Sequence, residues 1–237
     1  MKTVILLAGH ATRMKPLSSY LNKGMIPIVG RPLAEYIVTS LVRQGFDDIV
    51  FAVTAFPEQL THHFGDGSRF GASIEYVSRP QPSGTAGEVH ALADYIPSDE
   101  SFLVHYGDIL TNFDLQAMKA QHEALGAAAT LGLITSEHVH VGVSALDKDN
   151  RVIYYEEKPL LDKPCRAAID MYSPRVWSYL APGLDFGYDV IPAMMGADED
   201  VRGFVDCEAW WMDVGRLSDL DPATELMQQK AEEGYLS

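Results

Sequence analysis

The opening segment constrains the fold of this chain more than any other feature. A short apolar run with β-branched residues, Val4–Ala8, is typical of a buried strand. It breaks abruptly into a turn, Gly9–Thr12, which is followed by the cations Arg13 and Lys15. Backbone N–H groups in such a turn can point at phosphate oxygens, and the two side chains add positive charge. Because Lys23 precedes a second apolar run, these features together predict a triphosphate site at the edge of an α/β sheet.

Strand-like and helix-like segments alternate after this turn. Leu33, Ile37 and Leu41 recur at four-residue spacing, so Arg31–Gln44 is expected to be a helix that ends at Gly45. The βαβ rhythm predicts a Rossmann-like, doubly wound α/β fold with a mostly parallel, mixed sheet. The remaining expected elements are strands at Ile49–Val53, Ile74–Val77, Phe102–Tyr106 and Ala127–Ile134, and helices at Pro57–Phe64, Glu88–Tyr95 and Asp114–Leu125.

A single domain is expected, because no linker, repeat or charge block divides the 237 residues. Beyond Gly142 the pattern loosens into short strands and turns, and this half is expected to fold over the sheet edge. We therefore assign residues 1–135 to a nucleotide-binding part and residues 136–237 to an acceptor-binding part with a C-terminal helix. The helices expected in the second half are Pro174–Leu180, Tyr188–Met195 and Leu217–Glu233.

Charge and composition exclude several classes of partner. The formal net charge of −15 repels nucleic-acid backbones and anionic membranes, so a phosphate ligand must be held by local cations and metal ions. No apolar run approaches the roughly 18–20 residues that span a bilayer, and Val4–Ala8 is too short for a signal-peptide core. Cys165 and Cys207 lack metal-ligand spacing and are expected to be ordinary thiols. We therefore expect a cytoplasmic protein that binds small molecules.

Polar residues follow several of the expected strands. In open α/β sheets ligands bind beyond the carboxyl ends of the strands, where the first turn, the segment Gln81–Gly87 and Asp108 are expected to lie. Asp213 ends another apolar run. Two carboxylates at one place would suit Mg²⁺, which prefers oxygen ligands and substrate phosphates. Spacing alone leaves open whether Asp108 and Asp213 meet, and an aspartate that caps a turn is the alternative for Asp108.

Six segments resemble, in order, the motifs of the sugar-1-phosphate nucleotidyltransferases, the nucleoside-diphosphate-sugar pyrophosphorylases. The opening segment is similar to L-A-x-G-x-G-T-R-[LM]-x-P-L followed by P-K-x-[ML]-x-P-[IV]. The resemblance runs from residue 3 to about residue 220. The other five segments are the nucleobase loop Gln81–Gly87, the metal-binding Tyr106–Leu110, the E-K-P segment Glu156–Pro159, the D-[VI]-[IL]-P segment Tyr188–Pro192 and the second metal aspartate in Trp211–Gly215.

The resemblance implies an Mg²⁺-dependent enzyme that condenses an NTP with a sugar 1-phosphate into an NDP-sugar and pyrophosphate. It implies that Arg13 neutralises the leaving pyrophosphate, and that Lys23 binds the α-phosphate or the incoming phosphate. Lys158 would grip the acceptor phosphate, and Asp108 and Asp213 would hold Mg²⁺. The nucleotide is then expected at Leu7, Ala8, Gly9, Ala11, Thr12, Gln81, Gly84 and Thr85, and the acceptor at Gly142, Glu157, Lys158 and Asp170.

The nucleobase and the acceptor stay open at this stage. The amide of Gln81 donates and accepts, which suits uracil or thymine, but the following G-T-A-G is similar to guanylyl and uridylyl enzymes alike. Ala11 replaces the second glycine of the first motif, and Asn22 replaces a proline, which predicts a less rigid loop. Ala168–Tyr172 stands where the family has N-x-G-[IL]-Y, so Asp170 adds a carboxylate near the sugar.

Several alternatives follow from these departures. One is a cytidylyltransferase that acts on a non-sugar phosphate or phosphonate. Another is a non-catalytic relative that binds nucleotide sugars as a regulatory subunit, although it would not need both metal carboxylates. A dinucleotide-dependent oxidoreductase is disfavoured because Gly9–Arg13 does not match G-x-G-x-x-G. A homodimer is also allowed. Outside the family context, a solvated charge pair is the simpler explanation of Glu157 and Lys158.

Overall fold

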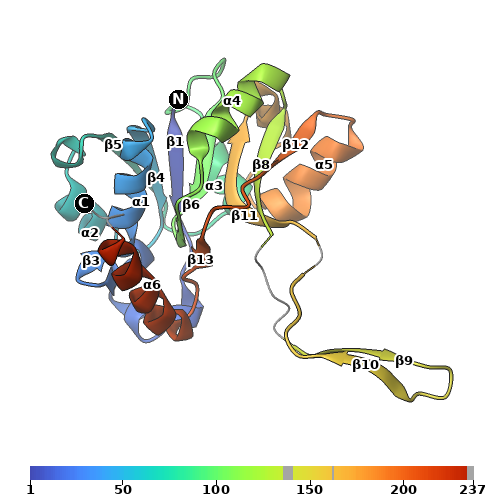
Figure 1. Cartoon of the computed structure of the whole chain (residues 1–237). Helices are drawn as coiled ribbons and strands as arrows, with labels where there is room; N and C mark the ends of the chain where they lie inside the picture. Colours follow the sequence, from blue (N-terminus) through green and yellow to red (C-terminus); the bar gives the residue numbers. More distant parts are fainter. Residues whose placement is uncertain (136–140, 162, 234–237) are drawn as a thin grey trace.

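The computed structural model describes residues 1–135, 141–161 and 163–233, and it is built on a seven-stranded sheet in the order β12-β8-β11-β6-β1-β4-β5. In this sheet β11 runs antiparallel to both neighbours, and all other neighbouring pairs are parallel. The expected mostly parallel, mixed α/β sheet is therefore confirmed (Figure 1). The strands are β1 Thr3–Leu7, β4 Asp48–Val53, β5 Ser73–Ser78, β6 Phe102–Tyr106, β8 Ala129–Ile134, β11 Cys165–Tyr172 and β12 Val201–Val205.

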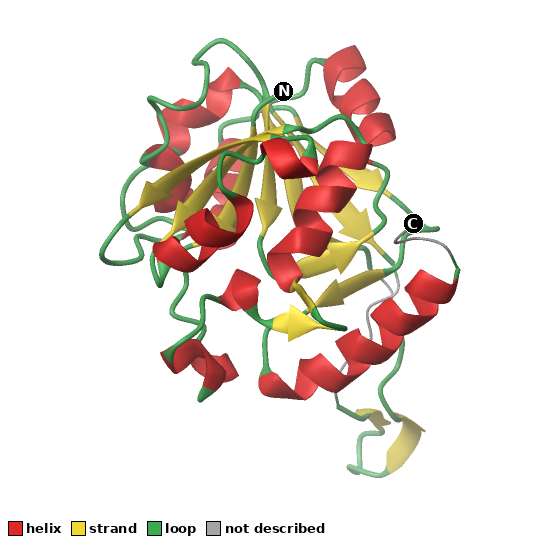
Figure 2. Cartoon of the chain, turned by 90° about the vertical axis from the view of Figure 1, so that its left-hand side faces the viewer, coloured by secondary structure: helices red, strands yellow, loops and turns green. Residues whose placement is uncertain are grey.

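Helices cover both faces of this sheet, as the side view shows (Figure 2). Successive residues of β1 point to opposite faces, so Ile5 packs with α1, α2 and α4 and Leu6 packs with α3 and α5. Each such buried aliphatic side chain contributes about 1.5–3 kcal/mol. The sheet is thus doubly wound, as expected. The helices are α1 Leu33–Arg43, α2 Pro57–Phe64, α3 Thr85–His90, α4 Leu115–Leu125, α5 Ile191–Gly196 and α6 Leu220–Glu232.

Helix α1 begins later than expected but ends as expected. Arg31–Pro32 forms β3, which pairs with β2 (Pro27–Ile28), so the helix starts after this short hairpin. At its C-terminus Gly45 adopts a φ of +76°, which favours glycine. The Gly45 and Phe46 amides donate to Val42 and Leu41, each at 2.9 Å, as in a Schellman motif.

Helix α3 differs most from its expected range, Glu88–Tyr95. It begins at Thr85, because the backbone N–H and hydroxyl of Thr85 both donate to the carboxylate of Asp185, at 3.2 and 2.9 Å. It ends at His90. Because Asp185 lies far along the chain, no local sequence signal indicated this start.

The second half of the chain contributes to the sheet, which corrects the expectation that it folds over the sheet edge. Strand β11 lies between β6 and β8, and β12 extends the sheet beyond β8. Figure 1 shows the hairpin of β9 (Val143–Leu146) and β10 (Val152–Glu156) projecting from the body. The expected helices here are observed as a 3₁₀ helix at Pro174–Tyr179, a π-helical turn at Phe186–Val190 before α5, and a 3₁₀ turn at Leu217–Asp219 before α6.

A small antiparallel pair, β7 (Ile109–Thr111) and β13 (Trp211–Asp213), lies outside the main sheet. Helix α6 packs beside it through Ala223 and Met227, in one buried cluster with Val214. This pair joins the segment after β6 to a segment from the end of the chain. Within the described ranges no helix is both long and apolar enough to cross a bilayer.

Candidate functional site

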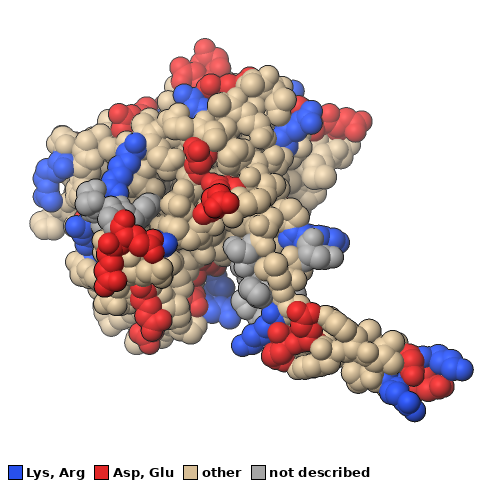
Figure 3. All heavy atoms as spheres, viewed as in Figure 1, with Lys and Arg blue, Asp and Glu red and all other residues tan. Residues whose placement is uncertain are grey.

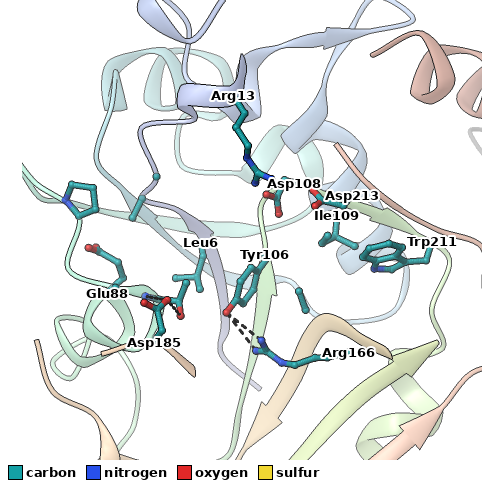
Figure 4. A pocket seen from close by; sticks show the side chains of 16 residues that line it. Leu6, Arg13, Glu88, Tyr106, Asp108, Ile109, Arg166, Asp185, Trp211 and Asp213 are labelled. Carbon is teal, nitrogen blue, oxygen red and sulfur yellow. Dashed lines mark hydrogen bonds between the residues drawn. The ribbon is translucent and has the colours of Figure 1, made fainter. Parts of the chain in front are cut away.

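A cavity of about 530 Å³ opens beyond the carboxyl ends of β1 and β6, where an open α/β sheet binds ligands. Figure 4 shows the side chains that line it. A smaller cavity of about 250 Å³ shares Leu6, Gly9, Arg13 and Asp108 with it and extends to Lys23. Of the expected nucleotide and catalytic residues, these two cavities are lined by Leu7, Ala8, Gly9, Ala11, Thr12, Arg13, Lys23, Gly84, Thr85, Asp108 and Asp213.

The first turn keeps a glycine-like backbone although one glycine is replaced. Ala11 has a φ of 44° and a ψ of 44°, in the left-handed region, and caps the 3₁₀ turn Thr12–Met14. The Met14 amide donates to the Ala11 carbonyl at 2.8 Å. A residue with a Cβ costs about 1–2 kcal/mol in this conformation. Ala11 therefore adds strain to this turn, which a glycine would avoid.

Asp108 and Asp213 meet, which answers the question that their spacing left open. Asp213 pairs with Ile109 across β7 and β13, and the Val214 amide donates to the Asp108 carbonyl at 2.9 Å. In Figure 4 both carboxylates point into the same end of the cavity, toward Arg13. Burial, with a further contribution from the negative charge of Asp108, raises the pKa of Asp213. The two carboxylates thus form a partly buried like-charge pair.

Lys23 lies against this pair and donates to Asp108 Oδ2 at 2.5 Å. Its loop is tied down by Asn22, which is 1% exposed. The Asn22 side chain accepts from the Gly24 amide at 2.8 Å and donates to the Ala55 carbonyl at 2.6 Å, and its backbone donates to Gln59 Oε1 at 2.8 Å. Asn22 therefore fixes the loop through hydrogen bonds, and the expectation of looseness from the missing proline is corrected.

The carboxylate pair fits a hard divalent cation. Asp108 and Asp213 offer only oxygen ligands, and Mg²⁺ is usually bound by one or two carboxylates together with substrate phosphates. No group of three or more His, Cys, Asp or Glu side chains that could hold a metal occurs in the part of the chain that the structure describes. Burial and, after it, the charge of Asp108 disfavour the charged form of Asp213, and a bound cation would favour that form.

The loop before α3 closes the other end of the cavity. Gly84 has a φ of 73°, and a Cβ there would lie 2.3 Å from the Leu184 carbonyl oxygen, so only glycine fits. Glu88 is 3% exposed and accepts from the Ser83 amide at 2.6 Å. Burial raises the pKa of Glu88. This carboxylate therefore holds the loop in place and also lines the cavity.

Gln81 does not line either cavity, although the sequence singled it out as a base contact. It is exposed, whereas Glu88 and Asp185 line the wall at this end. Figure 4 shows both carboxylates on the side of Tyr106 opposite to Trp211. The preference for a pyrimidine that was based on Gln81 therefore has no support from its position.

Asp170 is fully buried and does not line the cavity, which corrects its assignment as an acceptor contact. Its carboxylate pairs with Arg166, which does line the cavity and whose guanidinium carbon lies 5.2 Å from the centroid of the Tyr106 ring. The Tyr172 hydroxyl donates to Asp170 at 3.2 Å. A buried carboxylate needs such partners, because an unpaired charge in a protein interior is strongly destabilising.

Gly142, Glu157 and Lys158 lie on or beside the projecting hairpin, and none of them lines either of the two cavities at the strand ends. Glu157 is exposed and accepts from the Tyr155 hydroxyl. Lys158 is exposed and has a φ of 48°. Their proposed role at the acceptor thus receives no support from their place in Figure 1.

The sequence analysis assigned no role to several residues of the cavity wall. Arg166 and Asp170 carried the one usable signal, because two opposite charges four residues apart interrupt an otherwise apolar strand. Tyr106 and Trp211 lay within motifs but were given no role. The cavity-lining residues that had not been assigned include Glu88, Tyr106, Arg166, Asp185 and Trp211.

The fold and this site define a Rossmann-like α/β protein with a cationic turn facing two carboxylates at the strand ends. The chain belongs to the nucleotidyl transferase family, whose model matches residues 2–230. Enzymes of this family generally use a divalent metal, which agrees with the carboxylate pair.

Relatives in this family act on different nucleotides. The chain is 29% identical over 238 residues to a UTP--glucose-1-phosphate uridylyltransferase of Synechocystis, covering 92% of this chain and 61% of that protein. It is also 29% identical over 224 residues to a mannose-1-phosphate guanylyltransferase of Mycobacterium tuberculosis, covering 91% and 61%. The chain therefore spans less than two thirds of the length of these relatives.

A solved structure shows the same fold. HddC from Yersinia pseudotuberculosis, solved in complex with GMP-PN, superposes with a TM-score of 0.75 at 21% identity. The match covers 95% of this chain and 99% of that chain.

Proposed function

We propose that this chain transfers a nucleotidyl group from an NTP to a sugar 1-phosphate, forming an NDP-sugar and releasing pyrophosphate. The observation that carries the proposal is the convergence of Arg13, Lys23, Asp108 and Asp213 on adjoining cavities at the strand ends. The names of the relatives, which include uridylyl and guanylyl transferases of sugar phosphates, support it. A pure nucleotide-sugar binder would not need this pair of carboxylates.

In the proposed reaction an oxygen of the acceptor phosphate attacks the α-phosphorus, and the bond from that phosphorus to the bridging oxygen of the β-phosphate breaks. Such transfer needs positioning and neutralisation of charge more than covalent catalysis. Arg13 neutralises the leaving pyrophosphate with its planar guanidinium, and Lys23 binds the α-phosphate or the incoming phosphate as a point charge. Asp108 and Asp213 hold a divalent ion, proposed as Mg²⁺, which neutralises phosphate charge when bound.

We assign residues 1–135 to the nucleotide and residues 136–237 to the acceptor. Arg166, Ala168 and Trp211 support this division, because they line one wall of the cavity and come from the second half. Gly142, Glu157 and Lys158 remain proposed acceptor contacts. Glu157→Ala and Lys158→Ala test them, since an unchanged acceptor KM in both variants would contradict their role.

The deciding experiment measures pyrophosphate release for five NTPs against hexose 1-phosphates, phosphocholine and small phosphonates. We expect turnover with a hexose 1-phosphate. Turnover with only phosphocholine or a phosphonate would favour the cytidylyltransferase alternative, and nucleotide-sugar binding without any turnover would favour a regulatory relative. The nucleobase follows from the same matrix.

Small molecules are the proposed partners, and a cytoplasmic location and a homodimer are proposed with them. Lys and Arg are scattered and form no basic patch on the face drawn in Figure 3, which supports the absence of a nucleic-acid partner. Cys165 and Cys207 form no disulfide in the part of the chain that the structure describes, which supports a reducing compartment. Sedimentation equilibrium tests the dimer, and a monomeric mass at micromolar concentration would contradict it.

A further inference from the structure

Arg166 is held rigidly at the wall of the larger cavity. Its Nε donates to both Asp170 oxygens, at 3.2 and 3.0 Å, and its NH2 group also contacts Asp170. Asp170 is 0% exposed, so this ion pair is anchored inside the protein. The guanidinium carbon also lies 5.2 Å from the centroid of the Tyr106 ring. The orientation of Arg166 is therefore fixed before any ligand binds.

The edge of the guanidinium that faces away from Asp170 has only weak contacts. NH1 and NH2 lie 3.5 and 3.4 Å from the Tyr106 hydroxyl, beyond the 2.7–3.2 Å that is usual for a good N–H···O hydrogen bond. Arg166 lines the cavity, so these N–H groups can donate to a ligand inside it. Figure 4 shows Arg166 and Trp211 on the same side of Tyr106, across the cavity from Glu88 and Asp185.

The charge balance decides which ligand group suits this donor. The positive charge of Arg166 is already matched by the buried charge of Asp170. A carboxylate or phosphate placed against Arg166 would leave one excess negative charge in a cavity with four other carboxylates and one other cation. These are Glu88, Asp108, Asp185, Asp213 and Arg13. A hydroxyl oxygen accepts the same hydrogen bond and adds no charge. The site therefore favours a neutral oxygen.

The neighbouring wall suits a sugar ring. The indole N–H of Trp211 donates to the Ala167 carbonyl at 2.9 Å, which fixes an aromatic side chain at the cavity wall on the side of Arg166. A sugar presents an apolar C–H face and polar hydroxyl edges. A fixed aromatic surface beside a fixed N–H donor matches both features.

We propose that Arg166, positioned by Asp170, donates a hydrogen bond to a ring hydroxyl of the acceptor and thereby discriminates among sugar phosphates. The inference deepens the proposed function and rests on it. Arg166 is here a specificity residue, and Asp170 is a positioning residue that acts through it.

The test compares the steady-state kinetics of the wild-type protein with those of Arg166→Lys. The acceptor is the hexose 1-phosphate that the wild type uses best. Lysine keeps a positive charge beside Asp170 but loses the planar fork. We expect kcat/KM for the acceptor to fall about 10–100-fold, since a hydrogen bond to a charged group is lost, while the KM for the NTP stays within about twofold. Arg175→Lys is the matched control, because Arg175 pairs with Glu199 at 3.3 Å and lines neither cavity.

A series of monodeoxy hexose 1-phosphates locates the hydroxyl. In the wild type one deoxy position should reproduce the loss seen with Arg166→Lys, and in the variant the same deoxy position should add no further loss. If Arg166→Lys fails to fold, judged by its melting temperature, Arg166→Met/Asp170→Leu replaces the pair by apolar side chains and gives the same comparison.

An unchanged acceptor kcat/KM in a folded variant would overturn the inference and leave the proposed function intact. Equal losses for every deoxy sugar in both proteins would do the same. A wild-type preference for a uronic acid 1-phosphate that disappears in Arg166→Lys would also overturn it, because the ligand would then be anionic. Absence of pyrophosphate release from the wild type with the whole panel contradicts both proposals.

Discussion

At the scale of single residues, the candidate site depends on two like charges held together by the backbone. Asp108 and Asp213 are adjacent because β7 and β13 pair, and because Val214 donates to the Asp108 carbonyl. Burial and, after it, the charge of Asp108 raise the pKa of Asp213, and Lys23 and Arg13 offset part of this repulsion. A protein would not be expected to keep such a pair for stability alone, which makes it the first target for mutagenesis.

Asp108→Asn and Asp213→Asn are each expected to reduce metal-dependent pyrophosphate release by about 10²-fold or more, because each removes charge that helps to stabilise the transition state. The melting temperature of Asp213→Asn should stay the same or rise, since the substitution relieves repulsion. That of Asp108→Asn should fall slightly, because Lys23 loses its ion-pair partner. Asp221→Asn, in the exposed first turn of α6, is the matched control and should leave the rate unchanged. Wild-type rates in either active-site variant would exclude the metal assignment.

Ala11→Gly tests the strain in the first turn. Ala11 has a φ of 44°, so glycine should stabilise the protein by about 1 kcal/mol, measured by urea denaturation. Ala120→Gly, at an exposed position inside α4, should instead destabilise it by about 1 kcal/mol. Equal changes in both variants would show that the left-handed backbone at Ala11 carries no strain.

At the scale of elements, local patterns predicted what local interactions determine. Helix α2 and strand β6 occur over the expected residues, because periodic apolar residues and flanking turns set their limits. Helix α3 was misplaced because its first turn is capped by Asp185, and β11 was missed because its place between β6 and β8 depends on pairing with distant strands. The same reason explains why Arg13 and Asp108 were found but Arg166 and Asp185 were not.

Gly84→Ala tests the contact between the loop before α3 and the segment that caps it. A Cβ at Gly84 would lie 2.3 Å from the Leu184 carbonyl oxygen, in addition to the strain of a φ of 73°. We expect a loss of about 3 kcal/mol or more in the free energy of unfolding and a raised NTP KM, because the loop must move. Gly30→Ala separates the two effects, since Gly30 has a φ of 77° and nothing within 4 Å of its Cβ position. It should cost only about 1 kcal/mol; a similar loss in both variants would contradict the clash.

At the scale of the whole molecule, the sheet buries a histidine at its centre. His105 lies in β6 between β1 and β11, is 4% exposed, and has its Nδ1 2.7 Å from the Tyr106 carbonyl oxygen. Burial lowers the pKa of His105 to about 4 from its usual 6.5. The folded protein therefore keeps this side chain neutral at pH values where the unfolded chain protonates it.

This difference in pKa makes the stability of the whole protein depend on pH in a defined direction. Above about pH 6.5 both states are neutral at His105 and the contribution is constant; as the pH falls from about 6.5 to about 4, only the unfolded chain gains the proton, so the free energy of unfolding falls. The slope attributable to His105 approaches about 1.4 kcal/mol per pH unit. His105→Gln places an amide N–H donor in that position but cannot titrate, so its denaturation curves should lack this component. The buried His122, whose pKa is also lowered by burial, contributes equally to both proteins and cancels in the difference.

His62→Gln, on the exposed face of α2, is the control and should keep the wild-type slope. Parallel pH profiles for the wild type and His105→Gln would contradict the buried, neutral state of His105.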